Sequence, residues 1–183
     1  MGGSGSGRHS DFDSKQTVEG CLNLDVNKLA RDGMIREIPW QGTLVWSNTY
    51  TGETTASAGY TCTNDGDGWV FTLIYTVTRH DGVKHDVRVP IRLQVTKPHF
   101  GGTRWWFTCP LVVRGRACLR RVGKLHLPPG GLYFGCRTCY GLTYTSCQES
   151  HSYDRLFASI ARDVPGATPE LVKEALTGRW KRY

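Results

Sequence analysis

Between residues 43 and 108 the chain alternates apolar and polar positions in five short runs, a pattern typical of half-buried β-strands. Turn sequences rich in Gly, Asn and Asp separate the runs, and Asp81-Gly82 is the clearest signal for a tight hairpin. Pro90 cannot donate a backbone hydrogen bond, so it predicts a sheet edge or a bulge in the fourth run. We therefore predict an antiparallel meander with strands at 43–48, 54–62, 69–78, 84–96 and 103–108.

A helical pattern precedes this β region. Residues 17–33 predict one or two short helices, because Asp25 can cap a helix N-terminus and Gly33 can end one. Leu29 would lie on the buried side of the second helix. Two short helices can form a helix-turn-helix, but the second helix has barely two turns and too few exposed basic side chains. We therefore expect this segment to pack against the protein and not to bind DNA.

Two more helices are predicted after the four-cysteine segment, which ends at Tyr140. Ser146 and Glu149 form a capping-box pattern ahead of the first, and Thr168-Pro169 begins the second, which ends at Gly178. A basic aromatic tail, "RWKRY", follows. The apolar sides of the two helices are expected to hold Tyr153, Leu156, Phe157 and Ile160, and Leu171, Ala175 and Leu176, respectively.

Composition places the chain among folded proteins, since 39% of its 183 residues are hydrophobic. The longest apolar run, residues 69–75, is too short to span a membrane, and no basic-then-apolar leader opens the chain. We therefore expect a cytoplasmic protein with no membrane partner. In a reducing compartment, clustered cysteines bind metal more often than they form disulfides.

Four of the seven cysteines lie between Thr108 and Tyr140. The first pair is Cys109 and Cys118, and the second is Cys136 and Cys139. The sequence predicts a strand before and a strand after each pair, and the strand after the second pair would span 140–144. This is the arrangement of the two knuckles of a zinc ribbon. We predict one structural zinc ion bound by Cys109, Cys118, Cys136 and Cys139. The first spacing, with eight residues between the cysteines, exceeds the usual two to four. Two alternatives stay open: a redox pair or core thiols, or replacement of Cys118 by Cys147, His126 or His151.

The predicted fold class is thus α+β: an antiparallel β meander with an appended four-cysteine zinc ribbon and C-terminal helices. The expected organisation is a flexible Gly/Ser arm (1–14), a β domain with short N-terminal helices (15–103), the ribbon (104–145), and C-terminal helices with a basic tail (146–183).

Charge is concentrated in the middle of the chain. Residues 84–124 carry ten Lys and Arg against one acid, Asp86, a net charge of +9, which leaves −2 for the rest of a chain with net charge +7. This footprint favours a polyanionic partner over a merely solvated basic face. Alternation would place Arg120 and Lys124 on one strand face and Arg121 on the other. The expected nucleic-acid contacts are Arg8, Arg114, Arg116, Arg120, Arg121, Lys124, Arg137, Trp105 and Tyr140.

Four stretches stand out along the chain: "MGGSGSGR", "LDVNKLARDGMI", "RWWFTCP" and "CLRRVGKLHLPPGGLYFGCRTCYGLTYTSCQES". Together they resemble a widespread family of small bacterial proteins without an established activity, and the resemblance covers nearly the whole chain. It implies a β domain with a zinc ribbon. It also implies that the Gly/Ser arm is native to the protein.

No sequence motif for an enzyme is evident, and four thiolates would leave zinc no open position for catalysis. We expect a non-enzymatic zinc-ribbon protein that binds DNA or RNA, in transcription, RNA handling or a mobile-element process. The alternative is an adaptor that docks on a larger nucleoprotein machine such as a polymerase or recombinase. A third reading is a metal-dependent nuclease using His80-Asp81 and His85-Asp86, although Asp81-Gly82 is already needed by the hairpin turn.

Overall fold

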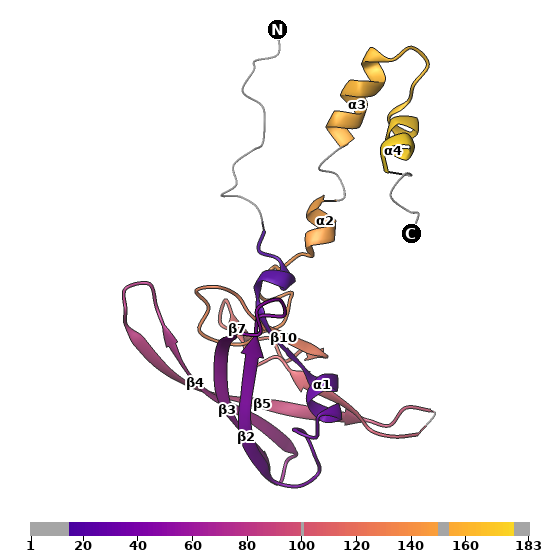
Figure 1. Ribbon diagram of the computed structural model, residues 1–183. Coiled ribbons are helices and arrows are strands. Elements are labelled where there is room, and N and C mark those ends of the chain that lie inside the picture. Colours follow the sequence, from indigo (N-terminus) through magenta and orange to yellow (C-terminus); the bar gives the residue numbers. More distant parts are fainter. Residues whose placement is uncertain (1–14, 100, 150–153, 178–183) are drawn as a thin grey trace. The chain divides into compact units, whose positions relative to one another are not determined.

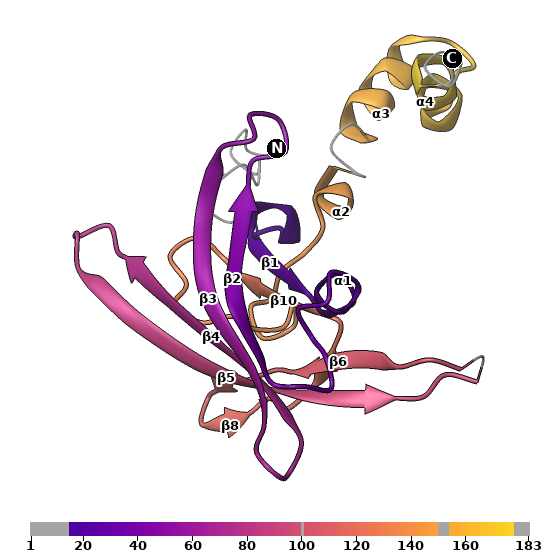
Figure 2. The same cartoon turned by 60° about the horizontal axis from the view of Figure 1, so that its bottom comes forward.

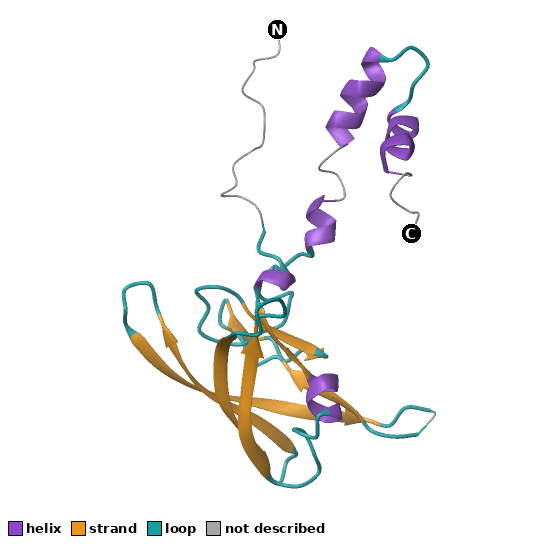
Figure 3. Cartoon of the chain, in the orientation of Figure 1, coloured by secondary structure: helices purple, strands orange, loops and turns teal. Residues whose placement is uncertain are grey.

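The computed structural model describes residues 15–99, 101–149 and 154–177. The chain divides into two compact units, Met1–Leu142 and Thr143–Tyr183. The predicted arm at 1–14, with Arg8, lies outside the described residues, as do His151, Tyr153, Gly178 and the basic tail. Strands dominate the first unit and helices the second (Figure 3).

The first unit is built on a curled antiparallel sheet (Figures 1 and 2). Its strand order is β2-β3-β4-β5-β6-β9, so the five predicted strands follow one another as a meander. Their bounds are β2 (Trp40–Ser47), β3 (Thr54–Asn64), β4 (Trp69–Thr78), β5 (Lys84–Thr96), β6 (Arg104–Thr108) and β9 (Arg121–Val122). The meander prediction is confirmed, and β4 and β5 have the predicted bounds.

The turn between β4 and β5 forms where the sequence indicates it. Gly82 has φ 79°, and Arg79 N–H donates to the Val83 carbonyl at 2.9 Å. Pro90 lies opposite Thr72 in an unshifted β4–β5 register, and β6 pairs with β5 only from Leu93 onward. Pro90 therefore marks a local sheet edge, not a bulge.

The inner face of the sheet follows the predicted alternation. Along β5, Val87, Val89, Ile91 and Leu93 are buried while the residues between them are exposed. These side chains join a single core cluster that also contains Cys109 and Cys136. The cysteine segment therefore shares its core with the sheet.

A second, two-stranded sheet pairs β1 (Leu22–Asp25) with β10 (Lys124–Leu127). The helical prediction for 17–33 is thus correct only in part. A 3₁₀ turn (Val18–Gly20) and α1 (Val26–Arg31) enclose the strand β1. Asp25 caps α1 as predicted, accepting a hydrogen bond from Asn27 N–H at 2.9 Å, and Gly33 follows with φ 70°. Strand β1 was missed because four residues ending in a helix cap carry little strand signal.

The remaining strands form a small hairpin of β7 (Val112–Val113) and β8 (Arg116–Ala117). It lies between Cys109 and Cys118, where the sequence predicted only a loop.

The second unit contains α2 (Thr145–Glu149), α3 (Asp154–Asp163) and α4 (Pro169–Thr177). Ser146 lies inside α2, so its predicted capping role is wrong, whereas Thr168 Oγ1 accepts from Leu171 N–H at 3.3 Å as a cap should. Phe157, Ala161 and Val172 make a small core. The predicted apolar side of α4 is also wrong, because Leu171 and Leu176 are exposed and Val172 packs instead.

Candidate metal centre

Four cysteine sulfurs meet in one place. The Sγ atoms of Cys109, Cys118, Cys136 and Cys139 all lie within 4.8 Å of one another. Cys109 Sγ is 3.9 Å from Cys139 Sγ, and Cys118 Sγ is 3.8 Å from Cys136 Sγ. Four sulfurs bonded at about 2.3 Å to one tetrahedral ion would lie about 3.8 Å apart. The cluster can therefore hold a metal ion, with Cys109 and Cys136 buried and the other two half-buried.

The long spacing in the first pair is resolved by the β7–β8 hairpin. Leu111 directly precedes the hairpin and Cys118 directly follows it. Cys118 N–H donates a hydrogen bond to the Leu111 carbonyl at 2.8 Å, which closes the base of the hairpin. The turn uses Arg114 with φ 51° and Gly115 with φ 76°, the positive angles that a two-residue type I′ turn requires. Eight intervening residues in sequence thus become a local turn in space with a hairpin inserted into it.

The main sheet holds the base of this hairpin from both sides. Thr108 pairs with Arg121 and Phe107 with Val122, where β6 runs toward Cys109 and β9 leaves Cys118. Cys109 N–H continues the ladder by donating to the Arg120 carbonyl at 2.8 Å. Strand pairing therefore positions Cys109 and Cys118.

The second pair sits in a compact turn. Cys136 N–H donates to Cys109 Sγ at 3.2 Å, and Cys139 N–H donates to Cys136 Sγ at 3.4 Å. Backbone amides aimed at sulfur favour the thiolate that binds metal. The predicted strand at 140–144 is wrong, because the chain turns through Gly141, which has φ 61°.

An aromatic anchor leads into this turn. Phe134 stacks on Trp46 with ring centroids 5.9 Å apart and meets Tyr75 edge-on at 5.8 Å. The Tyr75 hydroxyl donates to the Leu132 carbonyl at 2.7 Å. These contacts hold the second half of the centre on the sheet, and sequence reasoning missed them because they join residues far apart in the chain.

Gly135 lies where the half of the centre with Cys109 and Cys118 packs closely against the half with Cys136 and Cys139. It exchanges two backbone hydrogen bonds with His126, at 2.7 and 2.9 Å. A Cβ at Gly135 would lie 2.7 Å from Leu111 Cγ and 2.9 Å from Tyr140 Cε2. Only glycine lets the first knuckle, through Leu111, pack against the second.

The thiols differ in acidity. Burial raises the pKa of Cys109 to about 11 and also raises the pKa of Cys139. Burial pushes the pKa of Cys118 upward too, but the Arg120 amide and the neighbouring thiols outweigh it, so that this pKa is lowered. A metal ion must displace the protons of the raised thiols on binding.

The alternative ligands do not join the cluster. Among the described residues, the four cysteines are the only group of three or more potential ligands close enough to share an ion. His126 is buried, its Nδ1 has no hydrogen-bond partner, and burial together with Lys124 and Arg137 lowers its pKa. Cys147 belongs to the second unit, and His151 lies outside the described residues. Cys118 is therefore the fourth member.

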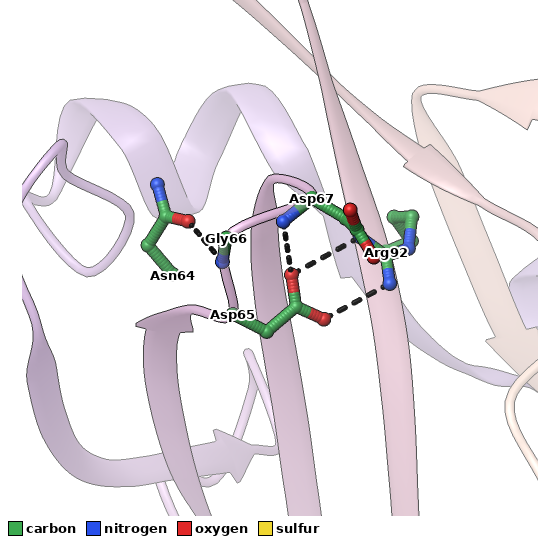
Figure 4. A network of polar contacts seen from close by, with 5 residues as sticks. All are labelled: Asn64, Asp65, Gly66, Asp67 and Arg92. Atoms are coloured by element: carbon green, nitrogen blue, oxygen red, sulfur yellow. Dashed lines mark hydrogen bonds and ion pairs between the residues drawn. The ribbon is translucent and has the colours of Figure 1, made fainter.

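Most cations of the basic segment 84–124 form no ion pair with a described carboxylate. Within the described ranges, ion pairs involve only two of the ten cations of 84–124: Arg92 with Asp65 at 2.9 Å and Lys124 with Asp25 at 3.2 Å. Figure 4 shows Asp65 held by Arg92 and by the Asp67 amide, and the Arg92 hydrogen bond is the main reason that the pKa of Asp65 is lowered. The predicted contact residues that remain exposed are Arg114, Arg116, Arg120, Arg121, Lys124 and Arg137.

Two aromatic predictions change. Trp105 is 6% exposed and belongs to the core, so it is wrong as a base-stacking residue. Its neighbour Trp106 lies on the opposite face, as strand alternation in "RWWFT" could have shown. Tyr140 is half-buried, its hydroxyl donates to the Tyr133 carbonyl, and burial raises its pKa to about 12.

The alternation predicted for residues 120–124 is wrong as well. Arg121 belongs to β9 in the main sheet, whereas Lys124 begins β10 in the two-stranded sheet. Leu119, with φ 52°, further breaks the extended chain before Arg120. These cations therefore do not share a single strand.

The His-Asp pairs have structural partners. Asp81 Oδ1 accepts from Val83 N–H at 3.0 Å inside the turn, and Asp86 Oδ1 accepts from Thr76 Oγ1 at 2.7 Å across the strands. Neither aspartate takes part in a cluster of potential ligands within the described chain.

No helix among the described residues has the length and apolar character needed to cross a membrane. Comparison of the chain with family models, curated proteins and solved structures finds no match. The family resemblance of the sequence stays a prediction, and function must be argued from the centre itself.

Proposed function

We propose that the four cysteines bind one structural zinc ion and that the cysteine segment acts as a zinc ribbon. The observation that carries this proposal is the sulfur spacing of 3.8 and 3.9 Å, which matches the edges of a single tetrahedral thiolate site. Soft thiolates select zinc over hard cations, and four of them leave no position for water. The ion would thus stabilise the fold instead of catalysing a reaction.

Elemental analysis of the intact protein tests the metal. One zinc per chain is expected, and a cobalt-substituted sample should show the absorption of a tetrahedral thiolate site. Clearly substoichiometric zinc in folded protein would contradict the ribbon.

We further propose that the zinc-stapled hairpin binds the phosphate backbone of nucleic acid, without catalysis. Arg114 and Arg116 are exposed on a hairpin whose base is fixed by two ligands, and no ion pair in the described chain occupies them. Guanidinium groups neutralise phosphates well, and a rigid base lowers the entropy lost on binding.

The test is a double charge reversal, Arg114→Glu with Arg116→Glu. Binding to a short duplex and to a single strand is measured across a salt series, with zinc content and melting temperature on the same samples. We expect zinc and melting to be retained while affinity falls at least about tenfold at low salt. The matched control is Lys28→Glu with Arg31→Glu, two exposed cations of α1 outside the basic segment.

Loss of zinc in the hairpin variant would mean that the hairpin is structural. Absence of salt-dependent binding in the wild-type protein would favour the adaptor function, which the exposed apolar residues Val112 and Leu119 also fit. Nuclease activity that is lost with His80→Ala and His85→Ala would overturn the non-enzymatic assignment.

A further inference from the structure

We infer that Arg104 and Arg121, held against Trp106 on the outer face of the sheet, form a second binding site for nucleic-acid phosphates. This inference rests on the proposed nucleic-acid function. It concerns a different surface from the hairpin, and none of the residues that carry it is a metal ligand.

Strand pairing brings the three side chains together. By strand alternation Arg104, Trp106 and Thr108 lie on the same face of β6, and Arg121 lies opposite Thr108, which is itself buried. The two guanidinium groups therefore reach the indole from opposite directions along β6. Their Cζ atoms lie 4.2 Å (Arg104) and 5.2 Å (Arg121) from the ring centroid of Trp106.

The ring itself is fixed in place. Trp106 Nε1 donates to Thr96 Oγ1 at 2.9 Å, across the β5–β6 pair. Two residues further along each strand, Gln94 Nε2 donates to Thr108 Oγ1 at 2.9 Å. A fixed indole presents both guanidinium groups with little freedom left to lose on binding.

Charge at this site is not balanced by the protein. No carboxylate in the described residues forms an ion pair with Arg104 or Arg121, in contrast to Arg92, whose partner is Asp65. Two cations beside one ring repel each other, and an anion between them would relieve that repulsion. Stacking uses the flat face of a guanidinium and leaves its N–H edge free to donate to phosphate oxygens.

The arrangement selects phosphate over base. A base that stacks on Trp106 would need a bare ring face, but guanidinium groups already lie over the indole. The same two strands lead to and from the hairpin, since β6 precedes Cys109 and β9 follows Cys118. A nucleic-acid backbone that engages Arg114 and Arg116 therefore has a second set of cations on adjoining chain, and we assign the site to that backbone.

The experiment compares three variants in duplex binding across a salt series. Arg104→Gln with Arg121→Gln should lower the magnitude of the slope of log K against log salt by about 2, because each lost phosphate contact removes about 0.9. Arg104→Lys with Arg121→Lys should keep most of the slope but lose affinity, since lysine does not stack or donate as a fork. Arg36→Gln is the matched control, because Arg36 also stacks on an indole, 4.6 Å from the Trp40 centroid, outside the basic segment.

Melting temperature and zinc content establish that each variant is folded. If the wild-type protein binds the duplex with a steep salt slope, and Arg104→Gln with Arg121→Gln leaves that slope unchanged, this inference fails while the proposed function stands. If the wild-type protein binds no nucleic acid, both fail. The same variant is also tested for binding to vesicles rich in phosphatidylserine at the same ionic strength. If it loses as much affinity for the vesicles as for the duplex, the site would be assigned to a membrane surface and the inference overturned.

Discussion

The two halves of the cysteine centre contain two of the four clustered cysteines each, yet they are built differently. In the second half, Cys136 and Cys139 are three positions apart and share one turn. In the first half, Cys109 and Cys118 are nine positions apart, and hydrogen bonds at the base of the β7–β8 hairpin bring them together. The sulfurs of both halves nevertheless lie within 4.8 Å of one another. Ligand spacing in a sequence therefore constrains a metal site only after the intervening hydrogen bonds are known.

The difference also separates two tasks. The second half is fastened to the sheet by Phe134 and packed at Gly135, so its residues serve mainly to hold the centre. Every residue of β7 and β8, and the turn between them, is exposed. Burial thus marks the second half as support, whereas the hairpin of the first half is exposed and is the surface at which we propose that nucleic acid binds.

The largest effect is expected from removing a buried ligand. Cys136→Ser should lower metal affinity by more than the 10- to 100-fold that loss of a supporting contact typically costs, and it should destabilise the segment that follows β6. Competition with a chelator of known affinity measures the first effect, and thermal unfolding the second. The control is Cys147→Ser, because Cys147 is exposed and lies in the other unit. Full metal binding by the Cys136 variant would show that the second half is dispensable.

The sequence alone predicted most of the sheet for a physical reason. Strands β3 to β6 combine strong alternation with Gly-rich turns, so local pattern and tertiary burial agree. Strand β1 is only four residues long and pairs with a strand about a hundred positions away, which no local pattern can reveal. The face of α4 was misjudged because Leu171 and Val172 are equally apolar, and only packing against Phe157 decides between them.

The next largest effect is expected at the contact between the halves. Gly135→Ala places a methyl group against Leu111 and Tyr140, and overpacking of this kind costs about 1–3 kcal/mol of unfolding free energy. Because Leu111 lies between the first two ligands in sequence, metal affinity should fall as well. Gly123→Ala is the control, since its added methyl would meet Asn27 Nδ2 only at an ordinary 3.9 Å. Equal unfolding free energies and metal affinities for the two variants would show that Gly135 is not needed for the two halves to pack together.

The clustering of the four cysteines could be predicted because thiols at knuckle positions have few other uses, but their surroundings could not. Two adjacent tryptophans illustrate the limit. Trp105 lies in the core, whereas the guanidinium groups of Arg104 and Arg121 lie over the ring of Trp106, and the strand register determines this difference. The hairpin in the first half was likewise invisible as structure, because its strands have only two residues each.

A smaller effect on stability, with a large one on binding, is expected when the first half is made to resemble the second. Replacing residues 112–117 by Gly-Gly leaves four residues between Cys109 and Cys118, within the usual range for a zinc knuckle. Because the removed residues are exposed, unfolding free energy should change by less than about 1 kcal/mol. Zinc should be retained and nucleic-acid affinity reduced. Loss of zinc would show that the hairpin shapes the site and is not merely carried by it.

The smallest effect sharpens the comparison at a single position. Arg114 has a positive φ, which costs a non-glycine residue about 1 kcal/mol, whereas asparagine is a preferred residue at this position of a type I′ turn. Arg114→Asn should therefore raise the free energy of unfolding slightly, by about 0.5 kcal/mol, while it lowers nucleic-acid affinity and the salt slope by about one phosphate contact. Thermal unfolding and the salt series measure the two changes on the same sample. Opposite signs would indicate that the turn keeps a strained arginine for binding. A variant that is both less stable and unchanged in binding would show that Arg114 supports the fold of the first half, and the division of tasks between the two halves would then be wrong.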